Sequence, residues 1–198
     1  NSERQLAEAS LNLALSKAPG SVSASWLQYS AQRFASVSEQ HQLVGNLLAE
    51  SGQLVTAQLE LEKKFRKNFL GLSLDATLQK LVLEGESVEA DALRSRRKMT
   101  DGRFWDLHVQ TLLDADRFGE AISFVNKVPP PSYDCKGYKT VVRSLVAAKR
   151  DDLALPFIRK LKKPKQQAEF LTQLGLHEEA RLAQDQRGLF GRFAGAWA

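Results

Sequence analysis

A spacing that recurs four times between residues 81 and 180 restricts this chain to a narrow set of folds. In each copy a residue suited to a turn stands five positions before an alanine: Gly85 before Ala90, Asp116 before Ala121, Lys149 before Ala154 and Gly175 before Ala180. The alanines lie 31, 33 and 26 residues apart. Three copies also carry two large apolar residues shortly before the turn: Leu81-Val82, Leu112-Leu113 and Leu145-Val146. Such periods are typical of α-solenoids, in which stacked helical hairpins bury one another's apolar faces.

The remaining segments are also patterned for helices. Leu and Ala dominate and runs of β-branched residues are nearly missing, so no strand is expected. Helices are predicted over 3–17 and 26–37, with 18–25 as a loop. From 39 to 67 one apolar face, which includes Val44, Leu47 and Gln58, stays in near-continuous register, so a single long helix is predicted. The predicted fold is all-α, an α-solenoid preceded by a long helix, divided at 1–37, 38–187 and 188–198.

Three helices are predicted around the first turn. A helix from Leu74 ends at Gly85, and the next helix turns Val88, Ala90 and Leu93 inward. Its basic residues, from Arg94 to Lys98, are predicted to face outward. A turn at Asp101-Gly102 then precedes a third helix.

The chain is basic, with a formal net charge of +5 and a pI near 9.4. Lysines and arginines cluster at 63–67, 94–98 and 159–165, each near a predicted helix end, where cations complement the carbonyl pole of the helix. No aromatic stacking platform accompanies them, so nucleic acid is not an expected partner. A basic helical-repeat module that binds nucleic acid stays open as an alternative.

Residues for catalysis or metal binding do not form a recognisable pattern. His41, His108 and His177 lie in different repeats without ligands at metal-binding spacing, and Cys135 is the single cysteine. No glycine-rich phosphate loop is present. We therefore expect no enzymatic activity, no cofactor and no metal. The sequence also lacks an apolar run near 18 residues, and it begins with Asn1, which indicates a piece of a longer protein.

One segment carries a more specific pattern. It contains a first set of residues, Leu72-Ser73-Leu74, Thr77, Leu81, Gly85, Ala90 and Leu93, and after a basic linker a second set, Asp101, Arg103, Phe104 and Trp105. Across residues 40 to 110 the chain resembles the family of C-terminal domains of vacuolar protein sorting-associated protein 16, a subunit of the HOPS and CORVET tethering complexes. It departs from the family pattern at Gly102, at Asp106 and in the 128–132 loop, which is proline-rich instead of lysine-rich.

The resemblance implies a non-catalytic scaffold in vesicle-mediated protein transport. By that resemblance the chain binds the Sec1/Munc18-family subunit of the tethering complex, so that SNARE assembly can be templated during membrane fusion. Its other partners would be further HOPS and CORVET subunits. It would be cytoplasmic, held peripherally through the complex on the cytosolic face of late endosome and vacuole or lysosome membranes. A paralogous subunit resembling spermatogenesis-defective protein 39, which pairs with a different Sec1/Munc18 protein, is the alternative.

The resemblance also implies two partner-binding surfaces. It places Arg103 at the interface with the Sec1/Munc18-type subunit, and arginine suits interfaces because its guanidinium makes bidentate and stacked contacts. Phe104 and Trp105 belong to the same motif, and we expect them to be mainly core residues with one edge exposed. The second surface lies on the long helix before the Leu72-Ser73-Leu74 segment, and its residues are Asn46, Leu47, Ala49, Glu50 and Gln53.

Overall fold

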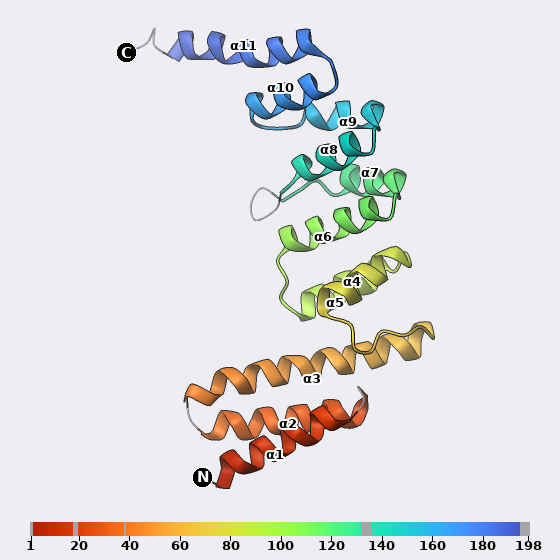
Figure 1. Cartoon of the computed structure of the whole chain (residues 1–198), viewed down its shortest axis with the longest axis vertical. Helices are drawn as coiled ribbons and strands as arrows, with labels where there is room; N and C mark the ends of the chain where they lie inside the picture. Colours follow the sequence, from red (N-terminus) through yellow and green to blue (C-terminus); the bar gives the residue numbers. More distant parts are fainter. Residues whose placement is uncertain (1, 18–19, 38, 132–135, 195–198) are drawn as a thin grey trace. The chain divides into compact units, whose positions relative to one another are not determined.

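The computed structural model describes residues 2–17, 20–37, 39–131 and 136–194, and within these ranges it contains eleven helices and no strand (Figure 1). The helices are α1 (Ser2–Ser16), α2 (Ser21–Val37), α3 (Glu39–Phe65), α4 (Leu74–Leu83), α5 (Ser87–Arg96), α6 (Asp101–Asp114), α7 (Phe118–Lys127), α8 (Tyr138–Ala147), α9 (Asp151–Ile158), α10 (Pro164–Gln173) and α11 (His177–Ala194). The predicted all-α class is confirmed. Superhelical stacking and the three-part division stay predictions.

The chain forms two compact units, residues 1–80 (unit 1) and 81–198 (unit 2). In the described part of the chain, no helix combines the length and the apolar character needed to cross a membrane.

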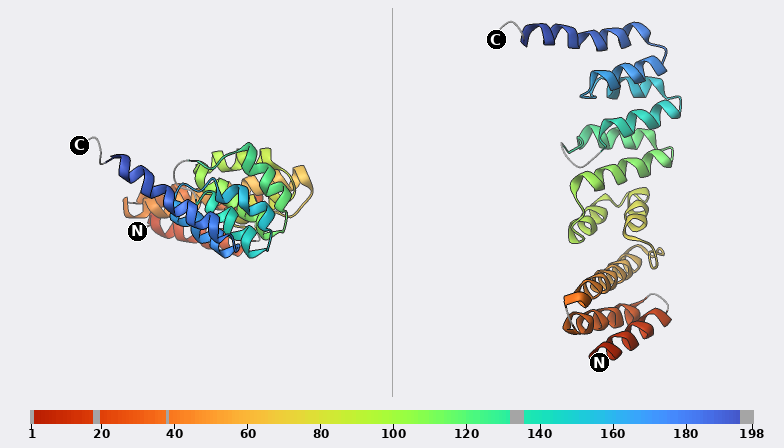
Figure 2. Two further views of the ribbon diagram at one scale, coloured as in Figure 1. Left: turned by 90° about the horizontal axis from the view of Figure 1, so that it is seen from above. Right: turned by 60° about the vertical axis from the view of Figure 1, so that its left-hand side comes forward.

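Unit 1 is built on small residues that repeat every seven positions. α2 packs against both α1 and α3, and the three helices lie side by side (Figures 1 and 2). The buried residues in this layer include Ala7 and Ala14 on α1, Ala24 and Ala31 on α2, and Gly45 and Gly52 on α3. Seven residues are about two helical turns, so each pair lies on one face of its helix. Their small side chains let the three backbones approach closely.

α2 and α3 approach each other closely at the two glycines. A Cβ atom added to Gly45 would lie 2.8 Å from the carbonyl oxygen of Ala31, and one added to Gly52 would lie 3.2 Å from that of Ala24. Between α1 and α2, the hydroxyls of Ser10 and Ser30 are 2.8 Å apart and hydrogen-bonded. The contact therefore depends on the absence of side chains at Gly45 and Gly52.

The structure of unit 1 confirms one expectation and corrects another. α3 is a single long helix, as predicted. The predicted loop at 18–25 is wrong for its second part, because α2 begins at Ser21 so that Ala24 can pack on α3. The apolar face of α3 is only partly buried, since Val44 and Leu47 are 38% and 56% exposed. The glycine face turns toward α2 and leaves those two side chains in solvent.

Two polar side chains of α3 hold the loop that leads into α4. Gln58 is 1% exposed, and its Nε2 donates to the carbonyl of Leu72 (2.7 Å) and to Oγ1 of Thr77 (2.8 Å). Ser73 precedes α4 and accepts the N–H of Ala76 (3.1 Å) in the manner of an N-cap. Leu72, Ser73 and Thr77 therefore serve the fold: they cap a helix and satisfy a buried amide.

Glu62 fastens the same loop from the next turn of α3. Its Oε1 accepts the backbone N–H groups of Phe69 (2.6 Å) and Leu70 (2.9 Å). The N–H of Leu70, followed by that of Phe69, lowers the pKa of the Glu62 carboxyl. Its stabilising contribution is present above the pKa of the unfolded chain and is lost as the pH falls through the lowered folded value.

The recurring spacing in unit 2 forms four turns of one kind. Gly85, Asp116, Lys149 and Gly175 all have positive φ, at 82°, 57°, 56° and 76°. The N–H of the residue after each turn donates to the carbonyl five positions earlier, at 2.9, 2.8, 2.9 and 2.9 Å. Together with the bond from the turn residue to the carbonyl three positions earlier, this is the Schellman arrangement, which satisfies the free carbonyls of a helix end.

The alanines complete each turn. Ala90, Ala121, Ala154 and Ala180 are between 0% and 4% exposed, and each donates its N–H to the carbonyl four positions earlier, in the first turn of the following helix. The predicted turn-to-alanine spacing is confirmed in all four copies. Val88, predicted to face inward, is 81% exposed, so that expectation is wrong.

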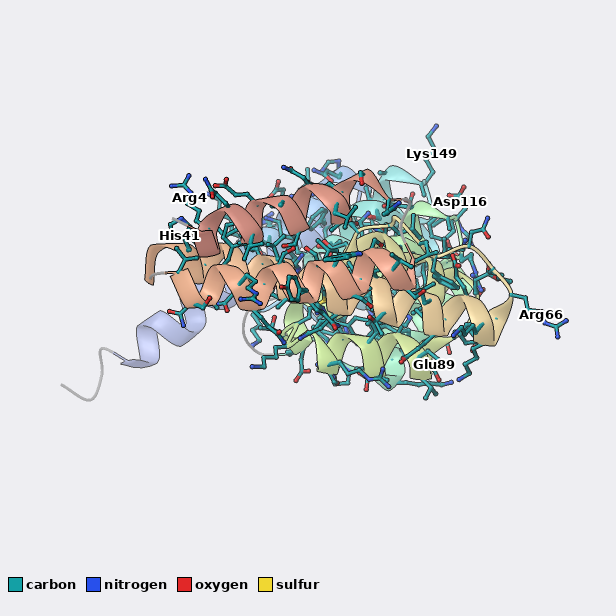
Figure 3. The ribbon with its side chains drawn as sticks, turned by 90° about the horizontal axis from the view of Figure 1, so that it is seen from below. Arg4, His41, Arg66, Glu89, Asp116 and Lys149 are labelled. Carbon is teal, nitrogen blue, oxygen red and sulfur yellow. The ribbon has the colours of Figure 1, made fainter. Side chains whose placement is uncertain are left out.

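Replacing the turn residues should change stability in opposite directions. Asp116 and Lys149 point outward from the ribbon (Figure 3). A left-handed backbone costs an L-residue about 1 to 2 kcal/mol, which glycine avoids. Asp116→Gly and Lys149→Gly should therefore raise the free energy of unfolding by about 0.5 to 1 kcal/mol each, after the larger entropy loss of glycine. Gly85→Ala should lower it by about 1 kcal/mol. Urea unfolding of the three variants measures these changes in the free energy of unfolding. Changes of the same sign in all three would contradict the prediction.

Candidate functional site

The motif arginine lies at the start of α6. Thr100 is the N-cap residue, and its Oγ1 accepts the N–H of Arg103 at 3.4 Å. Asp101 and Gly102 are already helical, so the predicted turn at these two residues is wrong: the cap lies one residue earlier. Arg103 is exposed, whereas Phe104 and Trp105 are 9% and 2% exposed. The motif thus presents one cation to solvent and two aromatic rings to the interior.

Trp105 joins α6 to the end of α7. Its Nε1 donates to the carbonyl of Val128 at 2.8 Å, and its ring centroid is 6.5 Å from that of Phe124. A buried indole N–H is thereby satisfied, which burial of a tryptophan requires. Trp105 is therefore a structural anchor of unit 2.

Arg94 of α5 lies over the ring of Phe104. Its guanidinium carbon is 5.5 Å from the ring centroid, its Nε donates to Asp91 at 3.0 Å, and it also pairs with Asp101. Its side chain is only 18% exposed. The prediction that Arg94 faces outward is wrong. Its contacts with two carboxylates and an aromatic ring compensate for the hydration that its guanidinium loses.

A cavity of about 320 Å³ opens beside these residues. Residues of α5, α6 and α7 line it. The charged ones are Asp91, Arg94 and Asp101, and the aromatic ones are Phe104, Trp105, His108 and Phe124. The lining is mostly apolar, which is typical of a pocket that receives an apolar group.

His108 is the one buried side chain in the described part of the chain with an unsatisfied polar atom. It is 5% exposed and stacks on Phe124 with ring centroids 3.9 Å apart. Its Nδ1 meets no hydrogen-bond partner among the described residues. Burial lowers the pKa of His108 to about 4, so the ring is neutral at physiological pH. The cavity therefore offers an apolar wall with one unused polar atom.

The second predicted surface lies on α3, in unit 1. Asn46, Leu47, Glu50 and Gln53 are exposed, and Ala49 is half-buried. Asn46, Glu50 and Gln53 follow helical spacing along one face. Beside them Leu43 and Leu47, four residues apart, are 67% and 56% exposed. The structure brings these residues together on one helix. The Arg103 cluster belongs to the other unit.

Sequence reasoning missed several features of the site. It assigned no role to Phe124, to the ion pairs of Arg94 or to the unsatisfied nitrogen of His108. The sequence did indicate one contact in the cavity lining: Phe104 and His108 are four residues apart on one helix, and such residues touch. Cys135 lies outside the described residues. Within the described ranges, no three potential metal-ligating side chains come close enough to share an ion.

Comparison with known proteins gives a consistent result. The family described as Vps16, C-terminal region, matches residues 1–191. The vacuolar protein sorting-associated protein 16 homolog of Drosophila melanogaster is 36% identical over 93 residues, which cover 46% of this chain and 11% of that protein. The Dictyostelium discoideum homolog is 26% identical over 140 residues (70% and 16%), and the Saccharomyces cerevisiae protein is 27% identical over 101 residues (51% and 12%). The chain thus spans a small part of these relatives.

Proposed function

Because the chain belongs to the family of Vps16 C-terminal regions, we propose that it is a non-catalytic docking platform of a vacuolar-sorting tethering complex. Its partner is the Sec1/Munc18-family subunit of that complex, which it holds for SNARE-mediated membrane fusion. Other subunits of the HOPS and CORVET complexes are its further partners. The complex acts on the cytosolic face of late endosome and vacuole or lysosome membranes.

The exposure of Arg103 is the observation that carries this proposal. In the Arg103-Phe104-Trp105 motif, the two aromatic residues have structural contacts that account for their presence. The arginine is exposed in the first turn of its helix, where a cation is electrostatically unfavourable. An exposed cation beside two buried aromatic residues of the same motif is a candidate for partner contact. Arginine is also enriched among residues that dominate binding energy.

Two further features support a docking role. On α3 the exposed Leu43 and Leu47 offer apolar area beside the polar residues of the second surface. In unit 2 the aromatic cavity, lined by the two residues that follow Arg103, has the size for one apolar side chain of the partner. A hydrogen-bonding group on that side chain would satisfy Nδ1 of His108.

Co-elution with the Sec1/Munc18-family subunit on a sizing column tests the proposal. The wild-type chain should form a stable complex, and Arg103→Glu should weaken binding at least ten-fold by reversing charge at the interface. Arg103→Glu should remain as stable as wild type, because an acidic residue suits the first turn of a helix. The matched control is Arg143→Glu, which makes the same charge change at an exposed position of α8.

Each part of the proposal has its own contrary result. A folded wild-type chain that forms no complex would reject the docking role. Equal binding by the Arg103→Glu and Arg143→Glu variants would reject the surface at Arg103. Replacement of Leu47 by Asp tests the surface on α3 in the same assay, and it should weaken the complex without unfolding unit 1, because Leu47 is exposed.

A further inference from the structure

A second cavity, of about 710 Å³, adjoins the aromatic cavity at Pro131, which lines both. The proline segment 129–131, the start of α8 and the segment between α9 and α10 line it. Five lysines contribute to its lining: Lys136, Lys139, Lys160, Lys162 and Lys163. Among the described residues that line it there is no carboxylate. Five ammonium groups around one hollow create a strong local positive potential.

Lys160 is held in place before any ligand arrives. Its Nζ lies 5.3 Å from the ring centroid of Tyr138 and 5.0 Å from that of Phe157, and it donates to Oδ1 of Asn126 at 3.3 Å. These contacts fix the ammonium without neutralising it, because neither the rings nor the amide carries a formal charge. A fixed cation loses less conformational entropy when it binds an anion.

The backbone adds to the positive potential. α8 begins at Tyr138 and α10 at Pro164, and Figures 1 and 2 show both helices beginning on the same side of unit 2. Residues of both starts line the cavity. The positive ends of two helix dipoles therefore reinforce the five lysines.

The chemistry of these groups selects one ligand class. Lysine binds phosphate as a compact point charge, and a phosphate group carries more negative charge than a carboxylate, so a cluster of lysines favours a phosphorylated ligand. The volume fits a small ligand, since binding pockets commonly measure about 300 to 1,000 Å³. A duplex or a long single strand would need an extended basic groove with stacking rings.

We propose that this lysine-lined cavity binds a multiply phosphorylated headgroup, carried by a membrane lipid or by a soluble inositol phosphate. The site borders the aromatic cavity, because Pro131 lines both, but none of its five lysines lines that cavity. Its ligand does not depend on the Sec1/Munc18 partner. A lipid source would give this part of the chain a membrane contact of its own.

The test uses the whole chain with two probes. One is inositol hexakisphosphate in solution, followed by calorimetry. The other is a vesicle of phosphatidylcholine containing phosphatidylinositol bisphosphate, followed by co-sedimentation. The cavity variant combines Lys139→Gln, Lys162→Gln and Lys163→Gln. The matched control combines Lys63→Gln, Lys64→Gln and Lys67→Gln, which removes the same charge from unit 1.

The proposal expects the cavity variant to bind inositol hexakisphosphate at least ten-fold more weakly than wild type, with the control close to wild type. Vesicle binding that inositol hexakisphosphate displaces would assign the lipid source, and binding of the soluble probe alone would assign the soluble one. An equal loss in both variants would overturn the proposal, since net charge would then explain the binding. No binding of either probe would also overturn it, as would displacement by polyuridine RNA and not by inositol hexakisphosphate.

Discussion

Lowering the pH should reduce the free energy of unfolding of the wild-type chain through His108. A His108→Phe variant should not lose this part of its stability. The folded state holds the ring neutral down to a pKa of about 4, whereas the unfolded chain takes up the proton near 6.5. The unfolded state therefore binds more protons between these values, and stability falls as the pH is lowered through that window. The share is about 3 kcal/mol, because each unit of difference between the two pKa values contributes about 1.36 kcal/mol.

Phenylalanine is the informative replacement because it keeps the stack on Phe124 and removes the unsatisfied Nδ1. At neutral pH the variant should be at least as stable as wild type, since an unsatisfied buried polar atom costs about 1 to 3 kcal/mol. Thermal unfolding across the window measures the difference, and His177→Phe at an exposed histidine is the control. Parallel pH curves for wild type and His108→Phe would contradict the account.

Gly45→Ala should destabilise the chain by about 2 kcal/mol, although alanine favours a helix over glycine by about 1 kcal/mol. The added Cβ would lie 2.8 Å from the backbone carbonyl oxygen of Ala31. A backbone atom cannot rotate away as a side chain can, so α2 and α3 would have to separate. The separation would weaken packing along the whole small-residue face.

Gly119→Ala is the matched control for this change. Gly119 is also helical, is exposed, and would give its Cβ no neighbour within 4 Å. That variant should be as stable as wild type or slightly more stable, because only helix propensity changes. Urea unfolding of both variants measures the contrast. A Gly45→Ala variant that gains stability would show that α2 and α3 are not in close contact.

The parts of the fold that could be predicted are those encoded locally. The turn at Gly85 and the burial of Ala90 follow from residues a few positions apart, because a left-handed helix end and a close helix contact each need a particular residue type. The packing of α1 to α3 could not be predicted in this way. Its buried face consists mostly of glycine, alanine and serine, and these residues give little hydrophobic contrast to a periodicity search.

The candidate site also has a part that could be predicted and a part that could not. Arg103 in solvent and Trp105 in the core match the expectations for a helix start with this motif. The cavity depends on Phe124, which belongs to the following helix, and on the placement of Arg94 over Phe104. Such contacts join residues from different helices, and a helical period in the sequence does not specify them. The basic cavity likewise joins lysines from two separate segments.

Hydrogen–deuterium exchange on the chain with and without the Sec1/Munc18-family subunit tests the docking role most directly. The first amides of α6 have no carbonyl partner within their helix, so they exchange quickly in the free chain unless another group covers them. Binding should slow exchange at residues 100–105 and leave α8 unchanged. Protection confined to other helices, with residues 100–105 exchanging as in the free chain, would contradict the assignment of the interface to Arg103.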